Sequence, residues 1–377
     1  MFTQRMVYCI LPPYLLREIA QRGSPAQRAS AQRAIIAAEQ VRSQRRTIQA
    51  NSAPMEAVSA AGKQRYVYDA KQSSVLPGIL VRKEGAPAVS DPAVNEAYDG
   101  SGTTYDLYYA IYGRNSLDNN GLKLDSSVHY QKGYDNAFWD GQQMVYGDGD
   151  EDLPAPERLF NRFTIAIDVI GHELTHGVTQ FAANLDYSGQ PGALNESISD
   201  VFGSLVKQYQ LKQTAGQADW LIGQGLFTSN VKGVALRSMK APGTAYDDPV
   251  LGKDPQPGNM KDYVNTVEDN GGVHINSGIP NHAFYVTSIN IGGYAWDKAG
   301  LIWYKTLTEK LGNLSNFQNA ADLTYAAAGE LFGTNSLEQN AVKAGWAEVG
   351  IIIGGQTQEG CFKATLRKLG LSGLLKG

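Results

Sequence analysis

The sequence predicts an α+β protein in which a β-rich half precedes an α-helical half. From residue 65 to residue 152, short Tyr- and Val-rich runs are separated by Gly, Asn and Asp, a pattern typical of strands and loops. Residues 300–350 instead show the helical repeat of amphipathic helices. Between the two halves, "RFTIAIDVIGHELTHGVTQFAANL" has helical periodicity and is the predicted joining helix. A length of 377 residues favours two or more domains.

Composition divides the chain into a leader (1–52), a β-rich lobe that includes the joining helix (53–186), an α-helical lobe (187–351) and a C-terminal extension (352–377). In the leader, "PPYLLREIAQRG" and "AQRASAQRAIIAAEQVRSQRR" predict helices separated by a break at 23–25. The small residues of "QANSAPMEAVSAAGKQ" predict an exposed linker that a protease can cut. For the extension, a disordered tail is favoured over an amphipathic helix that binds a membrane or a partner.

Charge is unevenly distributed along the chain. The net charge of −4 gives no reason to expect a nucleic-acid partner. Residues 1–50 contain eight Arg against two Glu, a net charge of +6, whereas the remainder contains 25 basic against 35 acidic residues, a net charge of −10. The difference indicates a basic arm that docks on an acidic body. The alternative is an Arg-bearing helix with a solvated face.

No segment has the length of a membrane span, and the N-terminus lacks the pattern of a secretory signal peptide. The two cysteines, Cys9 and Cys361, lie at opposite ends of the chain. Two thiols so far apart predict neither a disulfide framework nor a cysteine metal site.

The joining helix contains the motif "HELTH". His172 and His176 are four residues apart, so a helix places both imidazoles on one side, where they can bind the same metal ion. Glu173 lies roughly 100° around the helix, too far for a third ligand, but within reach of a water on the metal, whose proton it can accept. A buried helix whose histidines bond to polar neighbours is the alternative.

A second helix, "GALNESISD", contains the candidate third ligand. Glu196 can complete a set of two His and one Glu, which leaves one position open for water, as in catalytic zinc sites. Asp200 and Asn195 can each accept a hydrogen bond from the far nitrogen of a zinc-bound imidazole. The apolar residues around them indicate a buried helix, where carboxylates need partners. A solvent-facing acidic strip is the alternative.

Another candidate, His274, follows a glycine-rich turn in "EDNGGVHINSGIPNHAF". It could stabilise an oxyanion near the zinc, with Asp269 holding it oriented and charged. A surface histidine is the alternative reading. His129 and His282 have no such surroundings and are interpreted as structural or solvated.

These motifs together resemble the thermolysin family of zinc metalloproteases. The matching stretches extend over most of residues 66–350 and include "YDAKQSSVLPG", "SSVHYQKGYDNAFWDGQQMVYGDGD", "IDVIGHELTHGVTQ", "GALNESISDVFG", "LRSM" and "DNGGVHINSGIPN". The leader with "PPYLL" is similar to the protealysin-like branch, which has a short propeptide. The resemblance implies a β-rich N-terminal lobe and an α-helical C-terminal lobe, joined by the zinc-binding helix with the active-site cleft between them.

The resemblance also implies roles for individual residues. It implies one catalytic zinc on His172, His176 and Glu196, and an endopeptidase in which Glu173 is the general base for a zinc-activated water. It also implies that His274 and Tyr187 stabilise the transition state, with Asp269 as the group that orients His274. Asn136 and Ala137 would form an edge strand that binds peptide substrates, and Arg237 would bond to a substrate carbonyl. The implied substrate pocket consists of Phe160, Phe163, Val169, Ile222 and Leu236. Because this pocket is apolar, we expect cleavage on the amino side of bulky hydrophobic residues.

Calcium is expected to be weak or absent. At the family's paired calcium site, Asp168 and Asp219 are present, but other matching positions are Lys207, Leu221, Gln224 and Gly225. Calcium requires many oxygen ligands, and a lysine ammonium between two carboxylates can replace its charge.

The leader resembles a propeptide that inhibits its own enzyme and is removed near residues 50–54. Cys9 could ligate zinc in this proenzyme, although a lone cysteine is usually inert. The family implies a secreted protein, with a cytoplasmic one as the alternative, and we expect a monomer that acts on peptides and proteins. Two rival hypotheses are a zinc-dependent binding protein that keeps the fold without cleaving, and a structural zinc with a fourth protein ligand.

Overall fold

The computed structural model describes residues 8–49 and 62–355. The expected leader cleavage region (50–54), Cys361 and nearly all of the predicted C-terminal extension lie outside these residues. None of the described helices combines the length and the apolar character that a membrane crossing requires.

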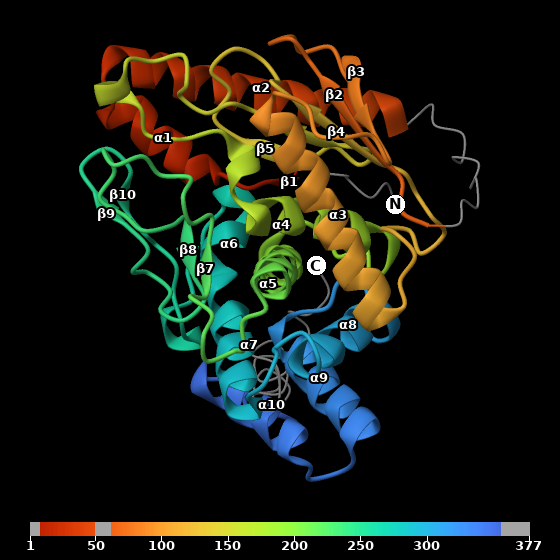
Figure 1. Cartoon of the computed structure of the whole chain (residues 1–377). Helices are drawn as coiled ribbons and strands as arrows, with labels where there is room; N and C mark the ends of the chain where they lie inside the picture. Colours follow the sequence, from red (N-terminus) through yellow and green to blue (C-terminus); the bar gives the residue numbers. More distant parts are fainter. Residues whose placement is uncertain (1–7, 50–61, 356–377) are drawn as a thin grey trace.

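A six-stranded mixed sheet forms the core of the N-terminal half (Figure 1). Its strands in chain order are β1 (Tyr8–Cys9), β2 (Arg65–Asp69), β3 (Ile79–Lys83), β4 (Leu124–Val128), β5 (Ala137–Trp139) and β6 (Met144–Tyr146). Their spatial order is β1-β5-β6-β4-β2-β3, with β2–β4 and β4–β6 parallel and the other pairs antiparallel. The leader strand β1 therefore covers the edge of β5.

The helix α3 (Pro92–Tyr112) corrects the prediction of strands and loops across this region. Asp91 caps the helix by accepting a hydrogen bond from the Ala93 N–H, and Pro92 occupies the first turn, so a helix start was present in the sequence. Gly100 and Gly102 weakened the helical pattern of this segment, because glycine has low helix propensity. Gly100 leaves room for the next helix, since a Cβ there would lie 2.4 Å from Ile170 Cδ1 and this buried side chain would have to shift.

The predicted joining helix is α4 (Ile167–Phe181), which packs against α5 (Gly189–Leu211) at the centre of the molecule (Figure 1). Two glycines set their closest approach. A Cβ on Gly203 would lie 2.4 Å from the Asp168 carbonyl oxygen, and one on Gly171 would lie 3.1 Å from Gly203 Cα. Without side chains here, the two backbones come close enough for both helices to contribute to one site. The motif "GALNESISD" opens at Gly192, and the helix that contains it begins three residues earlier, at Gly189.

The C-terminal half is mainly helical, as predicted, so the α+β fold class with its two lobes and joining helix is confirmed. Its helices are α6 (Asp269–Asn276), α7 (Gly278–Ile291), α8 (Ala299–Glu309), α9 (Phe317–Phe332) and α10 (Leu337–Glu348). Two small hairpins, β7 (Leu221–Ile222) with β8 (Arg237–Ser238) and β9 (Asp247–Asp248) with β10 (Gly252–Lys253), precede them. Short 3₁₀ turns occur at η1 (Ala155–Glu157), η2 (Phe163–Ile165) and η3 (Met260–Asp262).

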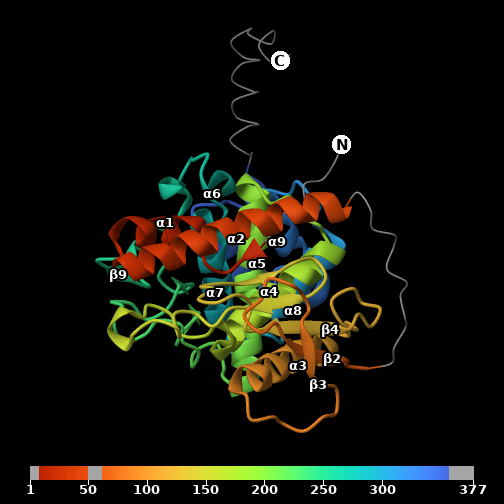
Figure 2. The same ribbon diagram turned by 90° about the horizontal axis from the view of Figure 1, so that it is seen from above.

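The leader helices α1 (Pro13–Arg22) and α2 (Pro25–Gln49) lie across the top of the body, which Figure 2 shows from above. The predicted break between them is confirmed at Gly23 and Ser24. Polar contacts hold the leader to the body: the Ser30 hydroxyl donates to Asp135 Oδ2 at 2.7 Å, and Arg17 pairs with Glu268 at 2.6 Å. The leader is therefore a docked element, as the charge distribution suggested.

Candidate active site

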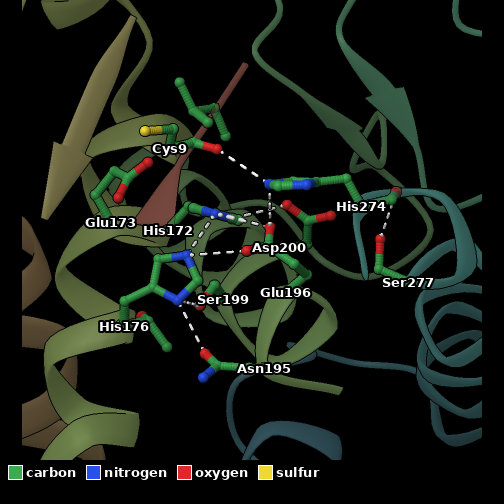
Figure 3. Close-up of polar contacts among 12 residues, drawn as sticks. Cys9, His172, Glu173, His176, Asn195, Glu196, Ser199, Asp200, His274 and Ser277 are labelled. Carbon is green, nitrogen blue, oxygen red and sulfur yellow. Dashed lines mark hydrogen bonds and ion pairs between the residues drawn. The ribbon is translucent and has the colours of Figure 1, made fainter. Parts of the chain in front are cut away.

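His172, His176 and Glu196 come together between α4 and α5 (Figure 3). The two Nε2 atoms are 3.0 Å apart, and each lies 3.5 Å from an oxygen of Glu196. All three side chains are buried. Glu196 Oε2 has no hydrogen-bond donor among the residues that the structure describes.

Neighbouring groups fix which imidazole nitrogens carry protons. His172 Nδ1 lies 2.8 Å from Asp200 Oδ1, and His176 Nδ1 lies 2.9 Å from Asn195 Oδ1. Because both oxygens can only accept, both Nδ1 atoms donate, which leaves two Nε2 lone pairs facing each other beside a carboxylate. Burial, followed by the proximity of His172, holds the pKa of His176 well below its usual value, so this ring stays neutral. Lone pairs so close repel unless a cation lies between them, and two imidazoles with a carboxylate suit zinc.

Glu173 points to the same region from α4 without joining the ligand set. Its Oε2 accepts a hydrogen bond of 3.0 Å from the backbone N–H of Trp139 in β5. The carboxylate is fully buried. The edge strand thus fixes Glu173 beside the ligands, where a proton acceptor is needed.

His274 and Tyr187 border the ligands on the side of the C-terminal half. The Tyr187 hydroxyl donates to Glu196 Oε1 and lies 3.2 Å from His274 Nε2. His274 Nδ1 lies 2.6 Å from Asp269 Oδ1. Burial acts to lower the pKa of His274, but the charges of Asp269 and Glu196 outweigh it and raise this pKa to about 9. His274 therefore carries a positive charge at neutral pH.

The turn before His274 brings Asp269 into contact with the His274 ring. Residues 269–272 all have positive φ, two of them in the glycines of "DNGG". The φ of 76° at Gly272 favours glycine, and a Cβ there would lie 2.8 Å from Asn276 Nδ2, which donates a hydrogen bond to the Val264 carbonyl. The turn folds Asp269 back onto His274, whose backbone N–H also donates to Asp269 Oδ2 at 2.9 Å.

Arg237, which was expected to contact a substrate carbonyl, also binds Asp200. Its Nε and Nη2 donate to the two oxygens of Asp200 at 2.9 and 2.8 Å. Burial acts to raise the pKa of Asp200, but the charge of Arg237 and the hydrogen bond from His172 outweigh it and hold this pKa well below its usual range. A permanently ionised Asp200 keeps the proton of His172 on Nδ1.

Sequence reasoning missed two residues of the site. Asn281, from α7, donates to Asp200 Oδ2 at 2.8 Å, and the Ser199 hydroxyl lies 3.0 Å from His176 Nδ1. Asn281 is 81 residues from Asp200 in the chain. Only the packing of α7 beside α5 brings it there, so no local spacing pointed to it.

The leader crosses the site along β5. The Ile10 N–H donates to the Ala137 carbonyl at 3.2 Å, and the Leu11 N–H donates to Asn136 Oδ1 at 2.9 Å. Arg237 Nη1 donates to the Ile10 carbonyl at 3.2 Å. The three residues expected to bind substrate thus all bind the leader.

Cys9 also presents a backbone group to the site. Its carbonyl oxygen lies 3.1 Å from His274 Nε2. Its sulfur is directed away from the two imidazoles (Figure 3) and does not belong to the group of converging metal-ligand atoms. The structure therefore gives no support to Cys9 as a zinc ligand.

The five residues of the expected apolar pocket are all buried, each exposing at most 1% of its surface. The rings of Phe160 and Phe163 lie 6.0 Å apart, and the Leu236 N–H donates to the Ile222 carbonyl at 2.9 Å. Val169 lies on the first turn of α4.

At the N-terminal end of α4, Lys207 lies between two carboxylates. Its Nζ is 3.2 Å from Asp168 Oδ2, 2.9 Å from Asp219 Oδ2 and 3.1 Å from the Leu221 carbonyl. Burial acts to lower the pKa of Lys207, but the charges of Asp168 and Asp219 outweigh it and raise this pKa. An ammonium ion thus occupies the place between these two carboxylates, as the sequence led us to expect.

The remaining histidines lie in other surroundings. His129 is held between Asp91 at 2.8 Å and Asp148 at 2.9 Å, and His282 Nδ1 lies 3.1 Å from the Met239 carbonyl. Both contacts are consistent with a structural role.

Comparison with known proteins agrees with this geometry. The family profile described as "Thermolysin metallopeptidase, catalytic domain" matches residues 38–180, and "Thermolysin metallopeptidase, alpha-helical domain" matches residues 183–351. An extracellular metalloprotease of Pectobacterium carotovorum subsp. carotovorum is 50% identical over 350 residues, which cover 93% of this chain and 98% of that protein. Protease PrtS of a Photorhabdus species is 53% identical over 292 residues, 77% of this chain and 76% of that one.

A solved structure described as the precursor of protealysin, a metalloproteinase from Serratia proteamaculans, superimposes with a TM-score of 0.82 at 52% identity, covering 91% of this chain and 99% of that chain. The predicted resemblance to the protealysin-like branch is therefore confirmed. The chain belongs to the thermolysin family of metallopeptidases.

Proposed function

We propose that this metalloprotease is a zinc-dependent neutral endopeptidase made as a proenzyme, which cleaves on the amino side of bulky hydrophobic residues. The observation that carries the proposal is the convergence of two imidazole lone pairs and a carboxylate beside Glu173. A site for structural zinc would need a fourth protein ligand, and the converging group among the described residues contains three.

A zinc ion held by His172, His176 and Glu196 would polarise a substrate carbonyl and lower the pKa of a water molecule. Glu173 accepts a proton from the attacking water and passes it to the leaving nitrogen. Charged His274 and the Tyr187 hydroxyl donate hydrogen bonds to the oxyanion that develops on the substrate. Asp269 keeps His274 oriented and protonated.

The edge of β5 binds the substrate as an added strand. The Ala137 carbonyl accepts from a substrate N–H, the Asn136 side chain bonds the next residue, and Arg237 donates to the carbonyl between them. The leader makes these same contacts, which supports the assignment. The apolar pocket of Phe160, Phe163, Val169, Ile222 and Leu236 selects a bulky hydrophobic residue.

The leader inhibits the enzyme by occupying this edge. While β1 pairs with β5, no substrate can form the same hydrogen bonds. Excision of the leader within the linker that follows α2 then opens the cleft. The proposed segments are the leader (1–52), the two catalytic lobes (53–186 and 187–351) and the extension (352–377).

We propose further that the enzyme is monomeric, needs little or no calcium, and acts outside the cell. The ion pairs of Lys207 support calcium independence. The name of the Pectobacterium relative, an extracellular metalloprotease, supports secretion. Fractionation of expressing cells, with the protease measured in medium and cytoplasm, tests secretion against a cytoplasmic location.

A Glu173→Gln variant tests the proposed reaction. It keeps the size and the metal ligands but cannot accept a proton, so we expect kcat on casein to fall by about 10²–10⁴-fold with zinc content unchanged. Glu338→Gln, in α10 and paired with Lys298, is the matched control and should retain full activity. If Glu173→Gln still cut casein at the normal rate, the protein would bind zinc without this mechanism.

A further inference from the structure

The leader segment 9–11 lies in the site in the register of a substrate. Four backbone groups of three consecutive residues contact the residues proposed to bind and activate a substrate: the Cys9 carbonyl with His274, the Ile10 N–H with Ala137, the Ile10 carbonyl with Arg237, and the Leu11 N–H with Asn136. The Asn136 amide also lies 3.4 Å from the Leu11 carbonyl. An inhibitor that merely covered the cleft would not need to satisfy each of these groups in turn.

This register identifies one peptide bond. The carbonyl oxygen beside His274 Nε2 is that of Cys9, at 3.1 Å, and His274 in turn lies 3.6 Å from the metal ligand Glu196. The nitrogen attached to this carbonyl is that of Ile10. The Ile10 side chain is fully buried, and a bulky apolar residue after the cleaved bond is what the proposed specificity requires.

We propose that Cys9–Ile10 is a cleavage site, hydrolysed by the protein within its own chain and distinct from the cut that excises the leader. A water oxygen adds to the Cys9 carbonyl carbon, the bond from this carbon to the Ile10 nitrogen breaks, and Glu173 transfers a water proton to that nitrogen. The products are a carboxyl group on Cys9 and an amino group on Ile10. The inference rests on the proposed function.

The cut leader remains bound. Leu15, Leu16 and Ile19 of α1 are each at most 2% exposed, and the contacts of Ser24 with Glu157 and of Ser30 with Asp135 lie beyond the cut. The new amino group still faces the Ala137 carbonyl. Cleavage at Ile10 therefore converts a bound substrate into a bound product, and the leader continues to inhibit until it is released.

N-terminal labelling with mass spectrometry tests the inference. The zinc-loaded precursor is incubated at several protein concentrations, and new N-termini are quantified over time. We expect a terminus at Ile10, on the whole chain or on the excised leader, that forms at a rate independent of protein concentration. Ile10→Asp should slow cleavage at this bond by at least about tenfold, because a charge replaces an apolar side chain. Ile36→Asp, an exposed position on α2 of the same leader, should have no effect.

Failure of the inference and failure of the proposed function give different results. If the mature enzyme cuts casein but no terminus at Ile10 forms, or if its rate rises in proportion to protein concentration, the inference is wrong. If casein is not cut either, the proposed function is wrong.

Hydrogen exchange of zinc-loaded Glu173→Gln precursor tests the register without catalysis. In this precursor the Ile10 and Leu11 amides should be protected from exchange, and the additional substitution Ile10→Asp should make both exchange faster. Rapid exchange of both amides in a folded precursor would contradict the register.

Discussion

The helices α4 and α5 contribute to two buried clusters that differ in how the negative charge of their carboxylates is balanced. At one, Asp168 with the nearby Asp219 surrounds the ammonium group of Lys207. At the other, one turn further along α4, the ligand atoms of His172, His176 and Glu196 converge with no lysine or arginine between them. The charged His274 lies to one side, 3.6 Å from Glu196 Oε2. The first cluster contains its own cation, and we propose that the second binds a cation from outside.

On our proposal, the difference teaches how one scaffold can keep one metal site and replace another. The Lys207 ammonium lies about 3 Å from both carboxylates, so it can supply positive charge where the family's paired calcium site would hold an ion. A lysine at one of the proposed zinc ligands would instead place an ammonium where the metal would bind and would leave no open position for water. The predictions below test this contrast, from the largest expected effect to the smallest.

Removing a zinc ligand should have the largest effect. Glu196→Gln keeps the shape but loses the charge, and we expect zinc affinity to fall by more than about 100-fold, since even groups that only orient the ligands contribute 10–100-fold. Zinc content after dialysis against a chelator measures this loss. Lys207→Met is the comparison, and a similar loss of zinc in that variant would show that the two clusters are not independent.

Removing the internal cation should affect stability. Lys207→Met leaves Asp168 buried beside Asp219 without a cationic partner, and we expect a loss of about 2–4 kcal/mol in the free energy of unfolding. Calcium should raise the melting temperature of this variant and leave the wild type unchanged. The matched control is Lys305→Met, which removes ion pairs with the exposed Glu309 and Glu330 and should change the melting temperature little. Calcium stabilisation of the wild type would refute the replacement argument.

A third cluster has a cation that pH can remove. Hydrogen bonding to Asp148 raises the pKa of His129 to about 9, against the opposing effect of burial. Because this pKa is higher than in the unfolded chain, protonated His129 stabilises the folded state. This contribution is complete below about pH 6.5 and is lost as the pH rises through 9. We expect it to amount to about 1–2 kcal/mol after solvent screening.

Urea unfolding from pH 6 to pH 10 measures this contribution. The wild type should lose stability relative to His129→Asn, and asparagine suits this position because residue 129 has a positive φ of 55°. Parallel stability curves for the two proteins over this range would show that His129 contributes no pH-dependent cation.

The sequence predicted the parts of this molecule that depend on local spacing. His172 and His176 share a face because they are four residues apart, and Asp200 and Asn195 lie against them as expected. Contacts made by tertiary packing were less visible. Asn281 reaches Asp200 from a different helix, and α3 was missed because Gly100, which weakens the helix signal, is there for packing.

The leader strand shows the same limit. With two residues, β1 is too short to produce an alternating pattern, and only its pairing with β5 defines it. The charge of the leader indicated that it docks, but the register in which Cys9, Ile10 and Leu11 cross the site required the structure.

The most direct test of the account is native mass spectrometry of the purified Glu173→Gln precursor, exchanged into buffer with a calcium chelator. The central claim is that the fold holds one external cation, zinc, between α4 and α5, and provides the other cation itself. We predict an intact chain with one zinc and no calcium. A precursor with no zinc, or one that keeps calcium and unfolds when calcium is removed, would contradict the account.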